Sequence, residues 1–336
     1  MTTEILNSQN EEDFEKAVSI LKNGGILAFP TETVFGIGAD MNNESAVKRI
    51  YEIKERNFSK PLSIHVANLD VAKPYIKNVP DDAYILEKNY LPGPLMMIFD
   101  KTDLVPNYVT ANLHKVGIRV PSNDIFKEIA NRFDGIIVAT SANKSGAFPA
   151  CSLEQVLNSL DGLIDGVFAN DSILAGLAST VIDLTSQPYR IIRSGFILGE
   201  DISELLGKHI LLSDDGDISG KAEQKSKLNI IVVYGERDKV LSKITTLYEK
   251  YSKEHEEKVG LLLTDGSEEK TGILKHTKFL GSVNELDHIA DSFFACIRAF
   301  EKEKMEIVLV EGISREGRGW TVMDRICSYA SEIISV

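Results

Sequence analysis

Three cationic side chains lie within seven residues of one another and indicate chemistry on an anion. Lys54, Arg56 and Lys60 precede Pro61, and spacings of two and four do not put all three on one face of a helix. We therefore expect a helix that stops near Lys54, followed by an extended loop that brings the cations together. Converging cations are costly unless an anion lies between them, and a polyphosphate suits them best. Spacing alone leaves solvated surface charges as the alternative.

A second polar group follows a short apolar run. In VATSANKSG, residues 138–146, the side chains of Ser141, Asn143 and Ser145 offer hydroxyl and amide groups. Open α/β sheets bind ligands at the carboxyl ends of their strands, so these side chains are candidates for hydrogen bonds to a ligand. A Ser- and Asn-rich turn that caps itself is an equally good interpretation.

A glycine-containing loop lies earlier in the chain. Gly36 and Gly38 follow Thr31 and Thr33 in FPTETVFGIGAD. Because glycine lets a backbone approach a ligand closely, we expect this loop to line a binding site.

Two arginines and one histidine lie among apolar residues. Arg119 in GIRVPS and Arg193 in IIRSG have strand-like surroundings. A buried arginine needs a fixed anionic partner, which is either a structural carboxylate or a ligand. His65 falls on the polar face of its expected strand, where a ligand contact and an ordinary half-exposed residue are both consistent with the spacing.

The first half of the chain predicts alternating strands and amphipathic helices that would position these residues. Apolar residues at helical spacing predict one helix ending at Asn23, one beginning near Asn43 and one capped by Asp124. Short apolar or alternating runs predict strands at residues 26–29, 62–66, 136–139, 179–184 and 189–193.

The second half predicts a separate domain. Residues 213–227 contain one aliphatic residue and no aromatic one, which is typical of a linker. Beyond it, strands and helices alternate, which favours a small doubly wound α/β domain. Its strands are expected at 228–234, 259–264 and 306–310, and its helices at 238–251, 285–304 and near the end. The expected boundaries are a catalytic domain at 8–210, a linker at 211–227 and a C-terminal domain at 228–336.

Composition and charge restrict the class of protein. The 336 residues are 43% hydrophobic and 26% charged, and the net charge of −13 disfavours nonspecific binding to nucleic acid or to anionic membranes. No apolar run has the length of a membrane-spanning helix, and the acidic N-terminal stretch lacks the features of a secretory signal. Three separated cysteines and six histidines show no disulfide framework and no metal-binding spacing. We expect a cytoplasmic protein without a side-chain metal site.

Taken together, the motifs resemble those of the threonylcarbamoyl-AMP synthases, which are built on a YrdC-type domain. They occur in the family's order over about residues 15–200, as FPTETVFGIGAD, KER, KPLSIHV, LPGPL, GIRVPS, TSANKSG, STVIDLT and IIRSG. The segment LVEGISREGRGWTVMDRI resembles the extra domain of longer family members. The fold implied is α/β: a YrdC-type twisted open α/β domain followed by a smaller doubly wound Rossmann-like α/β domain.

The resemblance implies a nucleotidyltransferase reaction. ATP, L-threonine and bicarbonate or CO2 would give L-threonylcarbamoyladenylate and pyrophosphate, with Mg²⁺ accompanying ATP. A downstream tRNA threonylcarbamoyl transferase complex would then modify the tRNA adenosine beside the anticodon.

The matched positions imply roles for individual residues. Lys54 and Arg56 would be catalytic. The residues implied at L-threonine are Thr33, His65, Arg119, Ser141 and Ser179, and those implied at ATP are Arg56, Lys60, Lys115, Asn143, Cys151 and Arg193.

Several positions depart from the family pattern. Met96 and Cys151 stand where the family usually has Thr, and Lys115 stands where it usually has a small hydroxyl residue. The linker also lacks the Gly-Met-Lys…His-Tyr-Ala-Pro sequence that reaches over the nucleotide in two-domain members, so we expect weaker nucleotide retention. These departures keep open a non-catalytic module that senses threonine or nucleotide. An RNA-binding protein is a further alternative, which the negative charge disfavours, and the zinc-binding cysteine pairs of the related hydrogenase-maturation carbamoyltransferases are absent.

Overall fold

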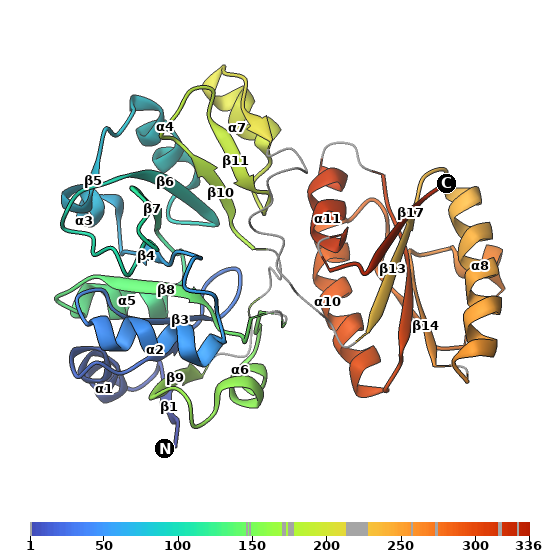
Figure 1. The fold of residues 1–336 in the computed structure, drawn as a ribbon, viewed down its shortest axis with the longest axis horizontal. Coiled ribbons are helices and arrows are strands. Elements are labelled where there is room, and N and C mark those ends of the chain that lie inside the picture. The colour runs from blue at the N-terminus through green and yellow to red at the C-terminus, as the bar shows by residue number, and fades with distance from the viewer. Residues whose placement is uncertain are drawn as a thin grey trace. The chain divides into compact units, whose positions relative to one another are not determined.

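The computed structural model describes residues 2–145, 147, 149–169, 173, 178–212, 228–256, 258–272, 275–314, 318–327 and 329–336. The chain divides into two compact units (Figure 1). The first contains Met1–Ser145 and Pro149–Gly220, and the second contains Lys221–Val336. Residues 213–227 of the expected linker lie outside the described residues, whereas Leu211–Leu212 form a short strand of the first unit. The domain boundaries expected from the sequence stay a prediction.

A mixed sheet of twelve described strands forms the centre of the first unit, in the order β1-β9-β2-β3-β8-β4-β7-β6-β10-β11-β12, with β5 beside β6. The strands are β1 (Glu4–Asn7), β2 (Leu27–Phe29), β3 (Gly36–Asp40), β4 (Ser63–His65), β5 (Ile76–Lys77), β6 (Leu95–Lys101), β7 (Lys115–Arg119), β8 (Ile137–Ser141), β9 (Gly166–Ala169), β10 (Thr180–Asp183), β11 (Arg190–Arg193) and β12 (Leu211–Leu212). The helices are α1 (Glu11–Lys22), α2 (Glu44–Lys54), α3 (Leu69–Ala72), η1 (Lys73–Tyr75), α4 (Asp81–Tyr90), α5 (Asp124–Arg132), α6 (Leu153–Leu160) and α7 (Gly199–Leu206).

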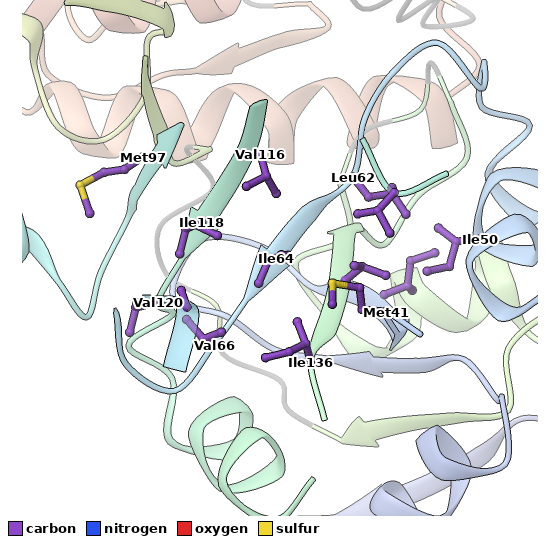
Figure 2. Close-up of a cluster of buried hydrophobic side chains, with 14 of the residues drawn as sticks. Met41, Ile50, Leu62, Ile64, Val66, Met97, Val116, Ile118, Val120 and Ile136 are labelled. Atoms are coloured by element: carbon purple, nitrogen blue, oxygen red, sulfur yellow. The ribbon is translucent and has the colours of Figure 1, made fainter. Parts of the chain in front are cut away.

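Alternating side chains of the central strands supply two hydrophobic clusters. Ile64, Ile118 and Val138 belong to the larger cluster, part of which is seen in Figure 2. The residues between them along each strand point to the opposite face, where helices α1 and α5 contribute to a smaller cluster around Phe29 and Phe126. The two faces therefore differ, and His65 and Arg119 lie on the face of the smaller cluster.

Local capping explains where the helices begin. The extended residue Asn43 accepts a hydrogen bond from Ala46 N–H and starts α2, as the sequence predicts. The expectation for α5 was wrong by one residue. Asn123 is the cap, because its side chain accepts from the N–H groups of Ile125 and Phe126, and Asp124 is the first helical residue.

The second unit is a parallel five-stranded sheet in the order β15-β14-β16-β13-β17. Its strands are β13 (Asn229–Tyr234), β14 (Val259–Leu263), β15 (Thr277–Phe279), β16 (Ile307–Glu311) and β17 (Glu332–Ser335). Helices α8 (Arg237–Glu254), α9 (Glu268–Thr271), α10 (Leu286–Lys302) and α11 (Arg318–Cys327) connect them. Helix α8 covers one face of the sheet, and α10 and α11 cover the other (Figure 1), so the predicted doubly wound fold is confirmed.

Candidate active site

The register of three adjacent strands brings the first polar residues together. His65 of β4 is paired with Arg119 of the parallel strand β7 and with Ile137 of the antiparallel strand β8. Paired residues project from the same face of a sheet. The sheet therefore places the imidazole and the guanidinium side by side, next to the aromatic cluster.

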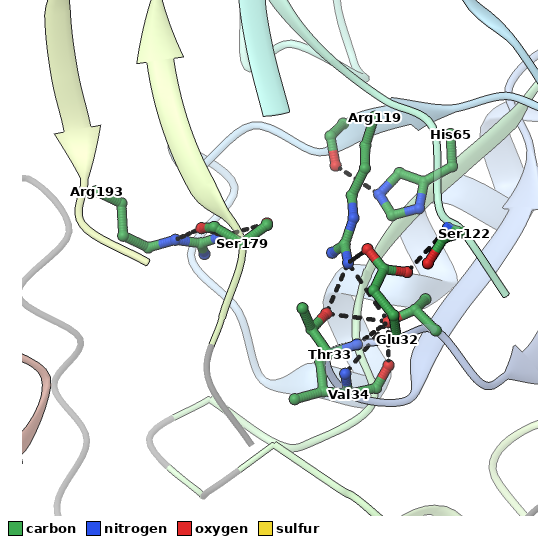
Figure 3. A network of polar contacts seen from close by, with 10 residues as sticks. Glu32, Thr33, Val34, His65, Arg119, Ser122, Ser179 and Arg193 are labelled. Carbon is green, nitrogen blue, oxygen red and sulfur yellow. Dashed lines mark hydrogen bonds and ion pairs between the residues drawn. The ribbon is translucent and has the colours of Figure 1, made fainter. Parts of the chain in front are cut away.

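Arg119 is buried and has the carboxylate partner that its surroundings required. Its Nη2 donates to Glu32 Oε1 at 2.9 Å and to Thr33 Oγ1 at 2.6 Å. The other oxygen of Glu32 accepts from the backbone N–H of Ser122 at 3.1 Å, so the carboxylate bridges two segments (Figure 3). Arg119 Nε is buried and has no hydrogen-bond partner among the described residues. Glu32 and Thr33 thus hold Nη2 of the guanidinium in place, while the Nε–H is left without an acceptor in the described chain.

The loop between β2 and β3 is held by a threonine. Thr31 Oγ1 donates to Val34 O at 2.6 Å and accepts from the backbone N–H groups of Thr33 and Val34. This turn holds the Thr33 hydroxyl against Arg119. The sequence predicted that the backbone at Gly36 approaches a ligand. In the structure the lack of a side chain serves packing instead, because a Cβ on Gly36 would lie 2.9 Å from the ring of Phe29.

His65 is a neutral, enclosed ring. Its Nε2 lies 3.1 Å from Ser63 Oγ, while Nδ1 is buried without a partner in the described chain. Burial, reinforced by the charge of Arg119, holds the pKa of His65 well below its ordinary value of 6.5. Figure 3 shows the ring beside the Arg119 side chain.

Lys54 is turned inward onto the loop after β8. Its Nζ donates to the main-chain oxygens of Ser141 and Asn143 at 2.5 and 2.6 Å and to Asn143 Oδ1 at 3.3 Å. The side chain is 1% exposed, and burial, with the charge of Arg56 adding to it, lowers the pKa of Lys54 well below its ordinary value. An ammonium has three hydrogens, and all three are directed at this loop, which also carries the hydrogen bond from Ser141 Oγ to Asn143 Oδ1 at 2.5 Å.

The loop after α2 folds back on itself. Helix α2 ends at Lys54 because Glu55 adopts a left-handed conformation with φ of 51°, as the expected stop near Lys54 requires. Arg56 Nη2 then donates to Pro61 O at 3.2 Å. Desolvation lowers the pKa of Arg56, so this guanidinium lies in a partly dry environment suited to a phosphate.

The remaining expected nucleotide residues lie on other elements. Lys115 begins β7, and its Nζ forms an ion pair with Asp183 Oδ2 at 2.9 Å. Arg119 ends the same strand, so the two residues lie roughly 13 Å apart at the rise of an extended chain. Arg193 donates through Nε and Nη2 to Ser179 O and through Nη2 to Ser179 Oγ (Figure 3). Cys151 lies just before α6, and its Sγ donates to Pro149 O at 3.8 Å.

The comparisons with known proteins agree with one another. A family model described as Telomere recombination, Sua5_yciO_yrdC, matches residues 19–195, and one described as Threonylcarbamoyl-AMP synthase, C-terminal domain, matches residues 222–331. A protein named Threonylcarbamoyl-AMP synthase from Pyrococcus abyssi is 33% identical over 322 residues, which are 92% of each chain. The chain belongs to the threonylcarbamoyl-AMP synthase family.

Further threonylcarbamoyl-AMP synthases and solved structures extend the match. The Bacillus subtilis protein of that name is 29% identical over 96% of this chain and 94% of its own length. A crystal structure of P. abyssi Sua5 complexed with L-threonine has a TM-score of 0.89 and 31% identity, and it covers both chains completely. Escherichia coli YciO matches 58% of this chain and 96% of its own with a TM-score of 0.53 and 25% identity. The resemblance predicted from the motifs is confirmed.

Two residues of this candidate site escaped the sequence reasoning. Glu32 holds Arg119, and Ser63 contacts His65. Ser63 could have been found, because residues two apart in a strand share a face. Glu32 could have been suspected because an arginine in apolar surroundings needs a carboxylate, but nothing in the sequence places residue 32 beside residue 119.

Proposed function

We propose that this chain makes L-threonylcarbamoyladenylate from ATP, L-threonine and bicarbonate or CO2, with release of pyrophosphate. Its relatives over nearly its whole length are named threonylcarbamoyl-AMP synthases. The observation that carries the proposal is the buried pair of His65 and Arg119, in which one ring nitrogen and one guanidinium nitrogen lack partners within the described residues. Buried polar groups are rarely left unpaired without a ligand to satisfy them.

The amino acid would bind at Arg119. The Nε–H of a guanidinium that Glu32 already orients is proposed to donate a charge-assisted hydrogen bond to the carboxylate. Thr33, Ser141 and Ser179 are the further residues proposed to surround threonine.

The phosphates are proposed to bind at the cationic side chains of the site. Arg56, Lys60 and Arg193 are proposed to offset the charge on the phosphoryl oxygens and on the leaving pyrophosphate, with Asn143, Lys115 and Cys151 at the rest of the nucleotide. Lys54 is proposed to act through the loop 141–143, because its ammonium already donates to three oxygens there. It would be a positioning residue rather than a direct phosphate ligand.

The reaction needs placement more than proton transfer. Carboxylation of the threonine amine gives a carbamate and releases a proton when CO2 reacts or a water molecule when bicarbonate reacts. The carbamate oxygen then attacks the α-phosphorus as pyrophosphate leaves. No general base is required when positioning and charge stabilisation carry the step. No group of three or more His, Cys, Asp or Glu side chains in the described chain is arranged to hold a metal ion, so Mg²⁺ is proposed to arrive bound to the phosphates of ATP.

The product would pass to a tRNA threonylcarbamoyl transferase complex, in the cytoplasm where ATP and tRNA are available. No described helix has the length and apolar character needed to cross a membrane. The named relatives favour this synthase over a sensing module or an RNA-binding protein.

The direct test is to incubate the protein with ATP, Mg²⁺ and bicarbonate, with and without L-threonine. We expect threonine-dependent pyrophosphate and the mass of threonylcarbamoyl-adenylate. Arg56→Ala should lower turnover on the order of 10²-fold, as loss of one preorganised donor does. Tight binding of threonine and ATP without product would support the sensing module instead.

A further inference from the structure

Tyr51 of helix α2 lies against the loop that carries two of the proposed phosphate-binding cations. It is 2% exposed, and it contacts three alternate residues of this loop. Its main-chain oxygen accepts from the N–H of Arg56 at 2.9 Å, its ring stacks on that of Phe58 at a centroid distance of 4.8 Å, and its hydroxyl donates to Lys60 O at 3.0 Å. One buried residue therefore supports the loop along its whole length.

The carbonyl of Lys60 has two donors of unequal strength. Besides the Tyr51 hydroxyl, Arg56 Nε donates to it at 3.4 Å. A carbonyl oxygen has two lone pairs, so these two donors satisfy it. The hydroxyl bond has an ordinary length for O–H···O, whereas the guanidinium bond is longer than is usual for N–H···O. Tyr51 thus holds the carbonyl firmly, and Arg56 holds it weakly.

The two acceptors of Arg56 differ in how easily they can lose it. Nη2 donates to Pro61 O at 3.2 Å in an exposed contact, where water can take its place. The contact of Nε with Lys60 O is partly buried, and an acceptor left unpaired there costs more. The presence of a second donor to Lys60 O therefore decides how readily Arg56 can turn away.

We propose that Tyr51 is a positioning residue that keeps the Lys60 carbonyl hydrogen-bonded, so that the Arg56 guanidinium can leave its own loop and bind the phosphates of ATP. The inference rests on the proposed function, in which Arg56 binds ATP, and it identifies what sets the cost of that contact. In the free protein the long loop bonds keep the guanidinium in place. ATP replaces them with charge-assisted hydrogen bonds, which are stronger.

A double-mutant cycle on the full-length protein tests this coupling. Calorimetry with ATP and Mg²⁺, in the absence of L-threonine and bicarbonate, gives the affinity without turnover. Tyr51→Phe should weaken ATP binding roughly tenfold, the value of one hydrogen bond. In Arg56→Ala the Lys60 carbonyl lacks the Arg56 donor both before and after ATP binds, so adding Tyr51→Phe should change the affinity by less than about twofold.

Tyr108 provides a matched control in the same unit. Its hydroxyl also donates to a main-chain oxygen at 3.0 Å, that of Met41, and Tyr108→Phe should leave the affinity for ATP unchanged. Urea unfolding and calorimetry with L-threonine show whether each variant is folded. We expect the wild type and both tyrosine variants to bind L-threonine equally.

NMR of the arginine Nε–H groups tests the wild-type protein directly. The Arg56 signal is assigned by its loss in Arg56→Lys, and it should move when ATP binds, because Nε then leaves Lys60 O. An Arg56 signal that stays in place at saturating ATP would overturn the proposal.

Equal weakening by Tyr51→Phe in the wild-type and Arg56→Ala backgrounds would show that Tyr51 only supports the loop, and would also overturn the proposal. An unchanged affinity for ATP in Tyr51→Phe would do the same. None of these results would touch the proposed function if the adenylate still forms. Conversely, a protein that shows the expected coupling but makes no adenylate would refute the synthase and leave this inference standing. A protein that binds no ATP would refute both.

Discussion

The inward-facing ammonium of Lys54 makes a quantitative prediction. In Lys54→Met, the main-chain oxygens of Ser141 and Asn143 lose the hydrogen bonds that Lys54 Nζ donates. Loss of a hydrogen bond from a charged group costs about 1–3 kcal/mol, so the free energy of unfolding of the first unit should fall by roughly 2–6 kcal/mol. Because the loop that carries Ser141 and Asn143 is then no longer held, kcat/KM should fall on the order of 10²-fold, as for a displacement of about 1 Å.

Lys101 provides a matched control within the same unit. It is also a buried lysine, and its Nζ donates to Val105 O at 2.9 Å and to Asn107 Oδ1 at 2.6 Å. Lys101→Met should therefore lower the free energy of unfolding by a similar amount, while its loop carries none of the residues proposed at the site.

The assay is pyrophosphate release by both variants at a temperature where each is folded, with urea unfolding measured in parallel. We expect both to be destabilised and only Lys54→Met to lose activity. If the two variants are equally destabilised and Lys54→Met keeps kcat/KM within about threefold of the Lys101→Met value, loop positioning by Lys54 is refuted.

Three further perturbations address other contacts. Because burial holds the pKa of His65 well below 6.5, only the unfolded chain takes up a proton at His65 as the pH falls below 6.5. The free energy of unfolding of the wild type should therefore fall with decreasing pH more steeply than that of His65→Gln, by up to about 1.4 kcal/mol per pH unit. Equal slopes in urea titrations would contradict a neutral His65. Arg119→Lys should weaken L-threonine binding about 10- to 100-fold by calorimetry, because an ammonium cannot present the guanidinium edge; unchanged affinity would remove Arg119 from the threonine site. Tyr189 donates to Asp82 at 2.7 Å, and burial, with this bond adding to it, raises the pKa of Tyr189 to about 12. Tyr189→Phe should therefore lower the free energy of unfolding by about 1–3 kcal/mol and leave the rate of pyrophosphate release unchanged, and a loss of activity at full folding would show that this contact reaches the site.

Helix and strand patterns predicted much of the fold because most elements carry their own signal. The stop of α2 at Lys54 and its start after Asn43 are local features, and the sequence predicted a helix between about these positions. Strand β1 was missed because three of its four residues are exposed, so no apolar run marks it. Its pairing with β9, far along the chain, is what makes it a strand.

The candidate site was predictable in its residue types and less so in its contacts. The need of Arg119 for an anion follows from its apolar neighbours, but the identity of Glu32 depends on tertiary structure that joins residues 87 positions apart. The charge of Lys54 indicated a phosphate, whereas its burial directs all its donors to protein oxygens. Charge shows that a cation needs a partner, and only packing decides which one.

The order of the strands also determines when the candidate site can form while the ribosome makes the chain. Strand β1 pairs with β9 across about half the chain, and β6 pairs with β10, so the sheet closes only after its late strands have been made. Such non-local pairing slows folding and leaves strand edges open in the meantime. Thr33 and Arg119 leave the ribosome long before Ser179 and Arg193, and a chain stopped between them would hold several of the proposed site residues without a complete sheet. The candidate site of the first unit therefore cannot be complete before strands β10 and β11 have been made.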